Sequence, residues 1–231
     1  MDHVPDTDPY PWPYDGDLDG RHLALVVAGA QPHWLARSVA TTPVLATLTD
    51  LGAAVRSSGG VVVALRHGRA AALAAVGHRP SLPTTGSDGW QLCLGSLTPD
   101  HVVDTSGLNG FHGSELDALL GGLGRSHLLF GGFCAELTVD TTLRSANDRG
   151  YESLVVTDAC AFVDPAVGAR AHSSVTMSGG IFGALGTSGA VCAAIGRRPR
   201  PSAAPTTSSA PTSAPATTSP VYPPPPPEED R

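Results

Sequence analysis

The sequence contains no lysine: all 14 of its basic residues are arginine, against 21 aspartates and glutamates, and the net charge is −7 at neutral pH. Six aspartates fall among the first twenty residues, where no arginine occurs. A chain of this sign does not attract polyanions, so we expect neither a nucleic-acid partner nor a membrane partner. The absence of lysine also excludes any site that requires a lysine ammonium group.

Paired metal-ligand spacings are missing as well. The four cysteines lack the CxxC spacing of a zinc site or the pattern of a disulfide framework, and no two histidines are closely spaced. We therefore expect reduced thiols in a cytoplasmic protein, and neither a metal ion nor another cofactor. Lone histidines near strand ends, such as His67 and His112, are expected to be solvated.

Long apolar segments are also absent. The first residues lack the basic and apolar stretches of a secretory signal, and this fits the expected cytoplasmic location. The longest apolar run, residues 181–195, is interrupted by glycines and is too short to span a bilayer.

Composition divides the chain into three parts. Residues 1–20 form an acidic arm with an aromatic Tyr-Pro-Trp-Pro-Tyr segment, which we expect to pack across the domain or onto a neighbouring subunit. Residues 21–195 carry the apolar patterns of one folded domain. Residues 196–231 are almost entirely Pro, Ala, Ser and Thr, and we expect them to be disordered because they cannot bury a core.

The folded part alternates short β-branched runs with helical patterns, which indicates an α/β fold, a three-layer α/β/α sandwich with a mostly parallel sheet. Strands are expected at residues 22–28, 60–65, 101–104, 126–130, 153–157 and about 179–184. Helices are expected near residues 43–57, 114–121, 138–149, 165–177 and 188–195. Residues 66–95 read as an irregular segment. Ligands of such sheets bind beyond the carboxyl ends of the strands.

Four segments carry a family resemblance: YPWPYDGDL at residues 10–18, LALVVAGAQ at residues 23–31, the helix at residues 138–151, and GGIFGALGTS at residues 179–188. Together they resemble the isochorismatase-like cysteine hydrolases, and within them the biuret-hydrolase type of amidohydrolase. The resemblance implies hydrolysis of amide or ureido C–N bonds by an aspartate, a lysine and a cysteine. In that chemistry the cysteine attacks, the aspartate moves its proton, and the lysine stabilises the thiolate.

Each of these three positions carries another residue in this chain. The aspartate position, two residues before Gln31, is Gly29, and the lysine position, six residues before Phe111, is Thr105. The cysteine position, which opens the helix at residues 138–151, is Thr138. Three coincident substitutions predict a catalytically defective member of the family, a pseudoenzyme that acts as a binding or regulatory subunit. The resemblance also implies a homo-oligomer, or a hetero-oligomer with an active paralogue.

The same resemblance suggests residues that bind a small amide or ureido ligand: Gln31, Trp34, Phe111 and Phe133. An alternative is an active hydrolase with a rearranged site, which uses Cys134 as nucleophile or a polar group such as Asp104, His112 or Glu136. A third possibility is a decaying paralogue without a selected role.

Two simpler interpretations compete with catalysis at these residues. Cys134 lies in the turn rather than at the helix N-terminus that makes a thiol acidic, which favours a small apolar loop residue. For Thr138, the position favours a threonine that caps the first helical turn.

Overall fold

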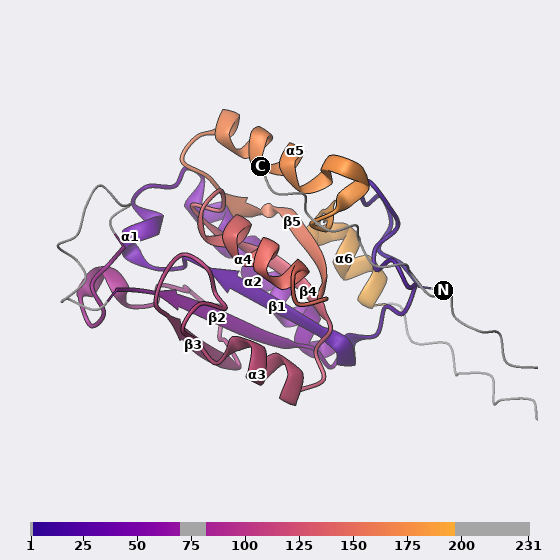
Figure 1. Ribbon diagram of the computed structural model, residues 1–231, viewed down its shortest axis with the longest axis horizontal. Coiled ribbons are helices and arrows are strands. Elements are labelled where there is room, and N and C mark those ends of the chain that lie inside the picture. The colour runs from indigo at the N-terminus through magenta and orange to yellow at the C-terminus, as the bar shows by residue number, and fades with distance from the viewer. Residues whose placement is uncertain (1, 70–81, 197–231) are drawn as a thin grey trace, which may run out of the picture. The chain divides into compact units, whose positions relative to one another are not determined.

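The computed structural model describes residues 2–69 and 82–196 (Figure 1). From residue 197 onward, the tail that we expect to be disordered lies outside the described residues, as do residues 70–81 of the irregular segment. Across the described ranges, no helix is long and apolar enough to cross a membrane.

Six strands form one sheet in the order β3-β2-β1-β4-β5-β6, and every neighbouring pair is parallel. This confirms the predicted α/β fold. The strands are β1 (Leu23–Ala28), β2 (Val61–His67), β3 (His101–Thr105), β4 (His127–Phe133), β5 (Glu152–Ala161) and β6 (Ala184–Gly186).

Helices cover both faces of the sheet (Figure 1). One face carries α2 and α6, together with Trp34 of the short α1, and the other carries α3, α4 and α5. The helices are α1 (Pro32–Leu35), α2 (Thr41–Ser57), α3 (Leu116–Gly122), α4 (Thr138–Asn147), α5 (Pro165–Gly180) and α6 (Ser188–Ile195). Two 3-10 turns, η1 (Gly20–His22) and η3 (Asp88–Trp90), complete the described elements.

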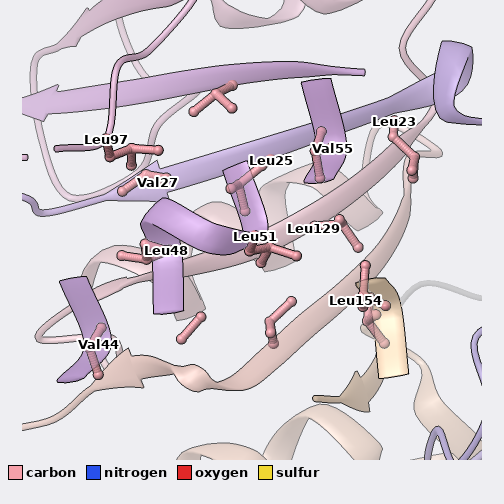
Figure 2. Close-up of a cluster of buried hydrophobic side chains, with 14 of the residues drawn as sticks. Leu23, Leu25, Val27, Val44, Leu48, Leu51, Val55, Leu97, Leu129 and Leu154 are labelled. Atoms are coloured by element: carbon pink, nitrogen blue, oxygen red, sulfur yellow. The ribbon is translucent and has the colours of Figure 1, made fainter. Parts of the chain in front are cut away.

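Strand β1 is buried on both faces, which explains why its sequence is a continuous apolar run. Leu23, Leu25 and Val27 pack toward α2, where Leu48 and Leu51 meet them (Figure 2). The alternate residues of β1 join the cluster on the opposite face. Because side chains alternate between the two faces of a strand, β1 contributes to two separate apolar layers.

The predicted end of the fourth strand and the predicted start of the last strand are wrong, in both cases because of the conformation of glycines. The fourth strand does not stop at the glycine pair but continues through it to Phe133. The last strand, predicted at about residues 179–184, begins only at Ala184, because Ser178, Gly179 and Gly180 have φ values of 54°, 78° and 86°. These values lie in the left-handed region and do not fit a strand, so β6 is confined to Ala184–Gly186.

The N-terminal arm packs against its own domain. Asp8 exchanges two backbone hydrogen bonds with Leu185 of β6, at 3.0 and 2.8 Å, in an antiparallel bridge. Trp12 is fully buried in the core on the α2 face. The arm therefore covers the free edge of β6, which would otherwise expose unpaired backbone groups.

Candidate active site

The carboxyl ends of β1 and β4 meet at the centre of the sheet. The strand order reverses between these two strands, and such a switch point is where parallel sheets leave room for a ligand. The two backbones approach closely there, because a β-carbon on Gly132 would lie 1.9 Å from the carbonyl oxygen of Ala28. Only glycine fits that position, so the glycine pair permits β4 to continue beside β1.

Thr138 begins α4 directly beyond this point, and its side chain is fully buried. Its hydroxyl donates a hydrogen bond to the carbonyl oxygen of Phe133 at 2.8 Å, and its N–H donates to Cys134 at 3.1 Å. A capping hydroxyl would instead accept a bond from the helix backbone. The interpretation of Thr138 as the helix cap is therefore wrong: the hydroxyl ties the helix back to β4.

Gly29 lies beside Thr138, as their predicted roles require. A β-carbon on Gly29 would stand 3.2 Å from the Thr138 hydroxyl oxygen. It would also stand 2.6 Å from the carbonyl oxygen of Phe133, and Gly29 has a φ of +69°. Any other side chain at residue 29 therefore meets both a strained backbone and a backbone oxygen. An aspartate at residue 29 would therefore require the Phe133 carbonyl to shift, since its β-carbon alone would meet that oxygen.

Thr105 ends β3, which β2 separates from β1. Its buried hydroxyl donates to the carbonyl oxygen of Gly107 at 2.8 Å and lies 3.2 Å from Nδ1 of His67. The same carbonyl lies 2.9 Å from Nδ1 of His67. Because a carbonyl only accepts, this geometry places a proton on Nδ1 and a lone pair on Nε2.

His67 is the largest departure from the expected solvated histidines. Strand β2 extends two residues further than predicted, and His67 ends it with its side chain fully buried. Burial lowers the pKa of His67 to about 4, so the imidazole is neutral at physiological pH. Within the described residues, its Nε2 has no hydrogen-bond partner. His67 is thus a buried neutral base beside the residue at the lysine position.

Arg66 brings a cation to this end of the sheet. Its guanidinium forms two hydrogen bonds with Asp104, at 2.6 and 3.0 Å, and stacks 3.6 Å above the ring of Trp90. Arg66 and Asp104 are cross-strand partners on β2 and β3, so the pair spans two strand ends. The charge of Asp104, one of the alternative polar groups, is therefore matched by Arg66.

The side chain of Gln31 forms hydrogen bonds with two segments, the end of β2 and η3. Its amide nitrogen donates to the carbonyl oxygens of His67 and Trp90, at 2.9 and 2.7 Å, and its oxygen accepts from the His67 N–H at 2.9 Å. The amide thus joins the end of β2 to η3. Its role in binding a ligand stays a prediction, but the polar atoms have these protein partners.

The three predicted aromatic residues do not share one surface. Trp34 and Phe133 are buried in the cluster on the α2 face, and the indole nitrogen of Trp34 has no hydrogen-bond partner among the described residues. Phe111 belongs to the opposite cluster, where its ring stacks on Tyr151 at 5.7 Å and lies below the guanidinium of Arg149. The structure therefore separates Phe111 from the other two.

Cys134 is buried in the turn between β4 and α4, with a left-handed φ of 46°. Its backbone N–H donates to the Ser38 hydroxyl at 2.8 Å, and its sulfur lies 3.6 Å from the carbonyl oxygen of Trp34. Burial raises the pKa of this thiol. These surroundings keep the thiol protonated and apolar, as in the simpler interpretation.

The other alternative polar groups are dispersed. His112 is exposed, whereas one oxygen of Glu136 accepts a hydrogen bond from the Val163 N–H at 3.3 Å. Among the described residues, no group of three or more histidine, cysteine, aspartate or glutamate side chains is arranged to hold a metal ion.

A family model described as the isochorismatase domain matches residues 23–184, most of the folded part of the chain. The chain belongs to the isochorismatase family. Ureidoacrylate amidohydrolase RutB of Enterobacter sp. (strain 638) is 27% identical over an alignment of 172 residues, and the match covers 60% of this chain and 75% of that protein. The RutB of Klebsiella pneumoniae (strain 342) is 28% identical over an alignment of 155 residues, and the match covers 57% of this chain and 66% of that protein.

Solved structures agree with this membership at the level of the fold. An isochorismatase family protein from Burkholderia thailandensis superposes with a TM-score of 0.66 at 23% identity, covering 76% of this chain and 96% of that protein. In this isochorismatase-family chain, the fold brings Gly29 and Thr138 together at the switch point. His67, which the sequence predicted to be solvated, is the functional candidate that sequence reasoning missed. Its position two residues after the buried Leu65, on the same face of β2, is the signal that could have found it.

Proposed function

We propose that this isochorismatase-family protein binds a small amide or ureido ligand and does not hydrolyse it by the aspartate, lysine and cysteine route. The observation that carries the proposal is the geometry at Gly29. The Phe133 carbonyl lies 2.6 Å from where its β-carbon would be, and this carbonyl also accepts the Thr138 hydroxyl. Residue 29 therefore supplies no carboxylate to Thr138.

Each remaining step of that chemistry lacks its group. A threonine hydroxyl requires an adjacent base to become a nucleophile, and the Thr138 proton is engaged with a backbone carbonyl. The position of the lysine is held by Thr105, whose hydroxyl donates to Gly107. The nearby Arg66 cannot replace the lysine freely, because its guanidinium is bound to Asp104 and Trp90.

The ligand class follows from the relatives. RutB is named a ureidoacrylate amidohydrolase, and the sequence resemblance points to the biuret-hydrolase subgroup. Both substrates contain a ureido group, in which two N–H-bearing nitrogens flank a carbonyl acceptor. We propose a ligand of that chemistry and a role as a binding or regulatory subunit in the cytoplasm. The subunit would assemble with copies of itself or with an active paralogue.

Two measurements on the purified full chain test this proposal. Ureidoacrylate, biuret, isochorismate and nicotinamide are each assayed for product, and the ureido compounds are assayed for a shift in the thermal midpoint. We expect stabilisation by a ureido compound without turnover. Turnover of any of the four that disappears in Thr138→Ala would overturn the proposal. Absence of any ligand-induced shift would reject the binding role.

The rearranged-site alternative has its own control. If Cys134 were the nucleophile, Cys134→Ser would abolish turnover and Thr138→Ala would leave it largely intact. Because the Cys134 thiol is buried and its pKa is raised, we expect negligible turnover in both Cys134→Ser and Thr138→Ala.

A further inference from the structure

A cleft lies near the amino end of β5, whereas the candidate active site lies beyond the carboxyl ends of the strands. The cleft has a volume of ≈ 250 Å³, and its walls come from the N-terminal arm, the end of α4, the start of β5 and the turn after α5. The lining includes Tyr10, Tyr14, Tyr151, Glu152 and Phe182. Glu152 is the first residue of β5. In Figure 1 the indigo arm passes beside the end of α5.

Glu152 brings an uncompensated negative charge into this cleft. One carboxylate oxygen accepts the backbone N–H of Tyr14 at 2.9 Å, and none of the ion pairs formed by the described residues includes Glu152. Arg144 lies over the lining ring of Phe182, 4.2 Å from its centroid, and pairs with Asp140 at 2.9 Å, whereas Arg149 pairs with Asp117 at 3.6 Å. The carboxylate is therefore held in place by hydrogen-bond donors and not by an opposite charge.

Aromatic rings surround this charge. Tyr10 and Tyr14 meet edge to face, with ring centroids 5.6 Å apart, and the Tyr14 side chain is 77% exposed. Burial, together with the charge and hydrogen bond of Glu152, raises the pKa of Tyr10, and burial with Asp117 raises the pKa of Tyr151 to about 12. Both phenols are thus uncharged at neutral pH. Neutral aromatic faces beside a carboxylate attract cations.

We propose that this cleft binds a small methylated ammonium cation, with Glu152 as its counter-charge and the rings of Tyr10 and Tyr14 beside it. An anion would be repelled by the carboxylate. A primary ammonium seeks several free acceptors, whereas Glu152 already accepts from Tyr14 and Tyr10. The volume of ≈ 250 Å³ holds roughly eight water-sized groups at about 30 Å³ each, which suits a compact cation. The site does not depend on the proposed fate of the candidate active site.

Choline and its uncharged isostere 3,3-dimethylbutan-1-ol are the probes, titrated into the full chain by calorimetry. We expect saturable binding of choline that weakens with added salt, and no saturable binding of the alcohol. Glu152→Gln keeps an acceptor for the Tyr14 N–H but removes the charge, and should weaken choline about tenfold. Tyr14→Ala should weaken it about threefold, whereas Tyr14→Phe keeps the ring and the affinity.

Asp50→Asn is the matched control, because it removes one exposed carboxylate on α2, outside the cleft, and should leave choline binding unchanged. The proposal is overturned if choline shows no saturation at millimolar concentration, if the alcohol binds equally well, or if Glu152→Gln binds choline as the natural chain does. If Glu152→Gln fails to fold, the comparison of Tyr14→Ala with Tyr14→Phe tests the proposal instead. Both variants should fold, because the Tyr14 ring is mostly exposed. Equal affinity in those two variants would then reject the site.

Discussion

Acidification should destabilise the fold through His67, and the size of the effect follows from its burial. The pKa of His67 is lowered from 6.5 to about 4 because the imidazole is completely buried. The folded state therefore binds this proton less readily than the unfolded state. Stability is retained above pH 6.5, declines as the pH falls, and levels off below about 4. Between pH 7 and pH 5 the two pKa values correspond to a loss of about 2 kcal/mol.

Urea unfolding at pH 7, 6 and 5 measures this loss, and His67→Asn isolates it. The asparagine amide reproduces the donor that faces Gly107, but it does not titrate. Other groups, including His172 with its own burial-lowered pKa, contribute equally to both proteins. The natural chain should therefore lose about 2 kcal/mol more than His67→Asn over this range. Parallel pH dependence in the natural chain and His67→Asn would refute the reasoning.

Three further perturbations probe the candidate active site. Gly29→Ala should lower the free energy of unfolding by about 3 kcal/mol in urea titrations, because the new β-carbon meets a backbone oxygen at positive φ. Gly150→Ala, with similar φ but open space, should lose only about 1 kcal/mol, and equal losses would contradict the close approach. Thr138→Val should lose about 1–2 kcal/mol by removing the buried hydroxyl donor, whereas Thr138→Ser should retain most of the stability. A thiol reagent at pH 7 should label exposed Cys93 rapidly and Cys134 slowly by mass spectrometry; rapid labelling of Cys134 would show an accessible thiolate.

The central fold was predictable because its signals are local. The unbroken apolar run of β1 indicates a strand buried on both faces, and Asp164 with Pro165 marks the start of α5, where the Asp164 carboxylate caps the helix by accepting from the Val167 N–H. The last strand was predicted to start too early, at about residue 179 instead of Ala184, because apolar composition does not report the positive φ of Gly179 and Gly180. The backbone conformation of these glycines depends on contacts with distant parts of the chain, which a local reading of the sequence does not reveal.

The site was less predictable for a related reason. The sequence placed Gly29 at the end of the first strand and Thr138 at the start of the helix after the fourth, and the structure brings them together. The burial of His67 depends on where β2 ends and on how residues 105–107 fold over it, which involves a hydrogen bond from its ring to Gly107, forty positions away. Such non-local packing decides whether a histidine is a solvated loop residue or a buried neutral base.

Gly29 and Thr138 are physically coupled through a single backbone group. The Phe133 carbonyl accepts the Thr138 hydroxyl and, in that orientation, occupies the space next to Gly29. A cysteine at residue 138 would donate only weakly to this carbonyl, and a side chain at residue 29 would require the carbonyl to move. If residue 29 alone becomes an aspartate, its side chain meets the Phe133 carbonyl oxygen. If residue 138 alone becomes a cysteine, this oxygen loses the hydroxyl that donates to it. Residues 29 and 138 are therefore coupled, and the proposed loss of hydrolysis results from the backbone conformation of the turn as well as from the substituted side chains.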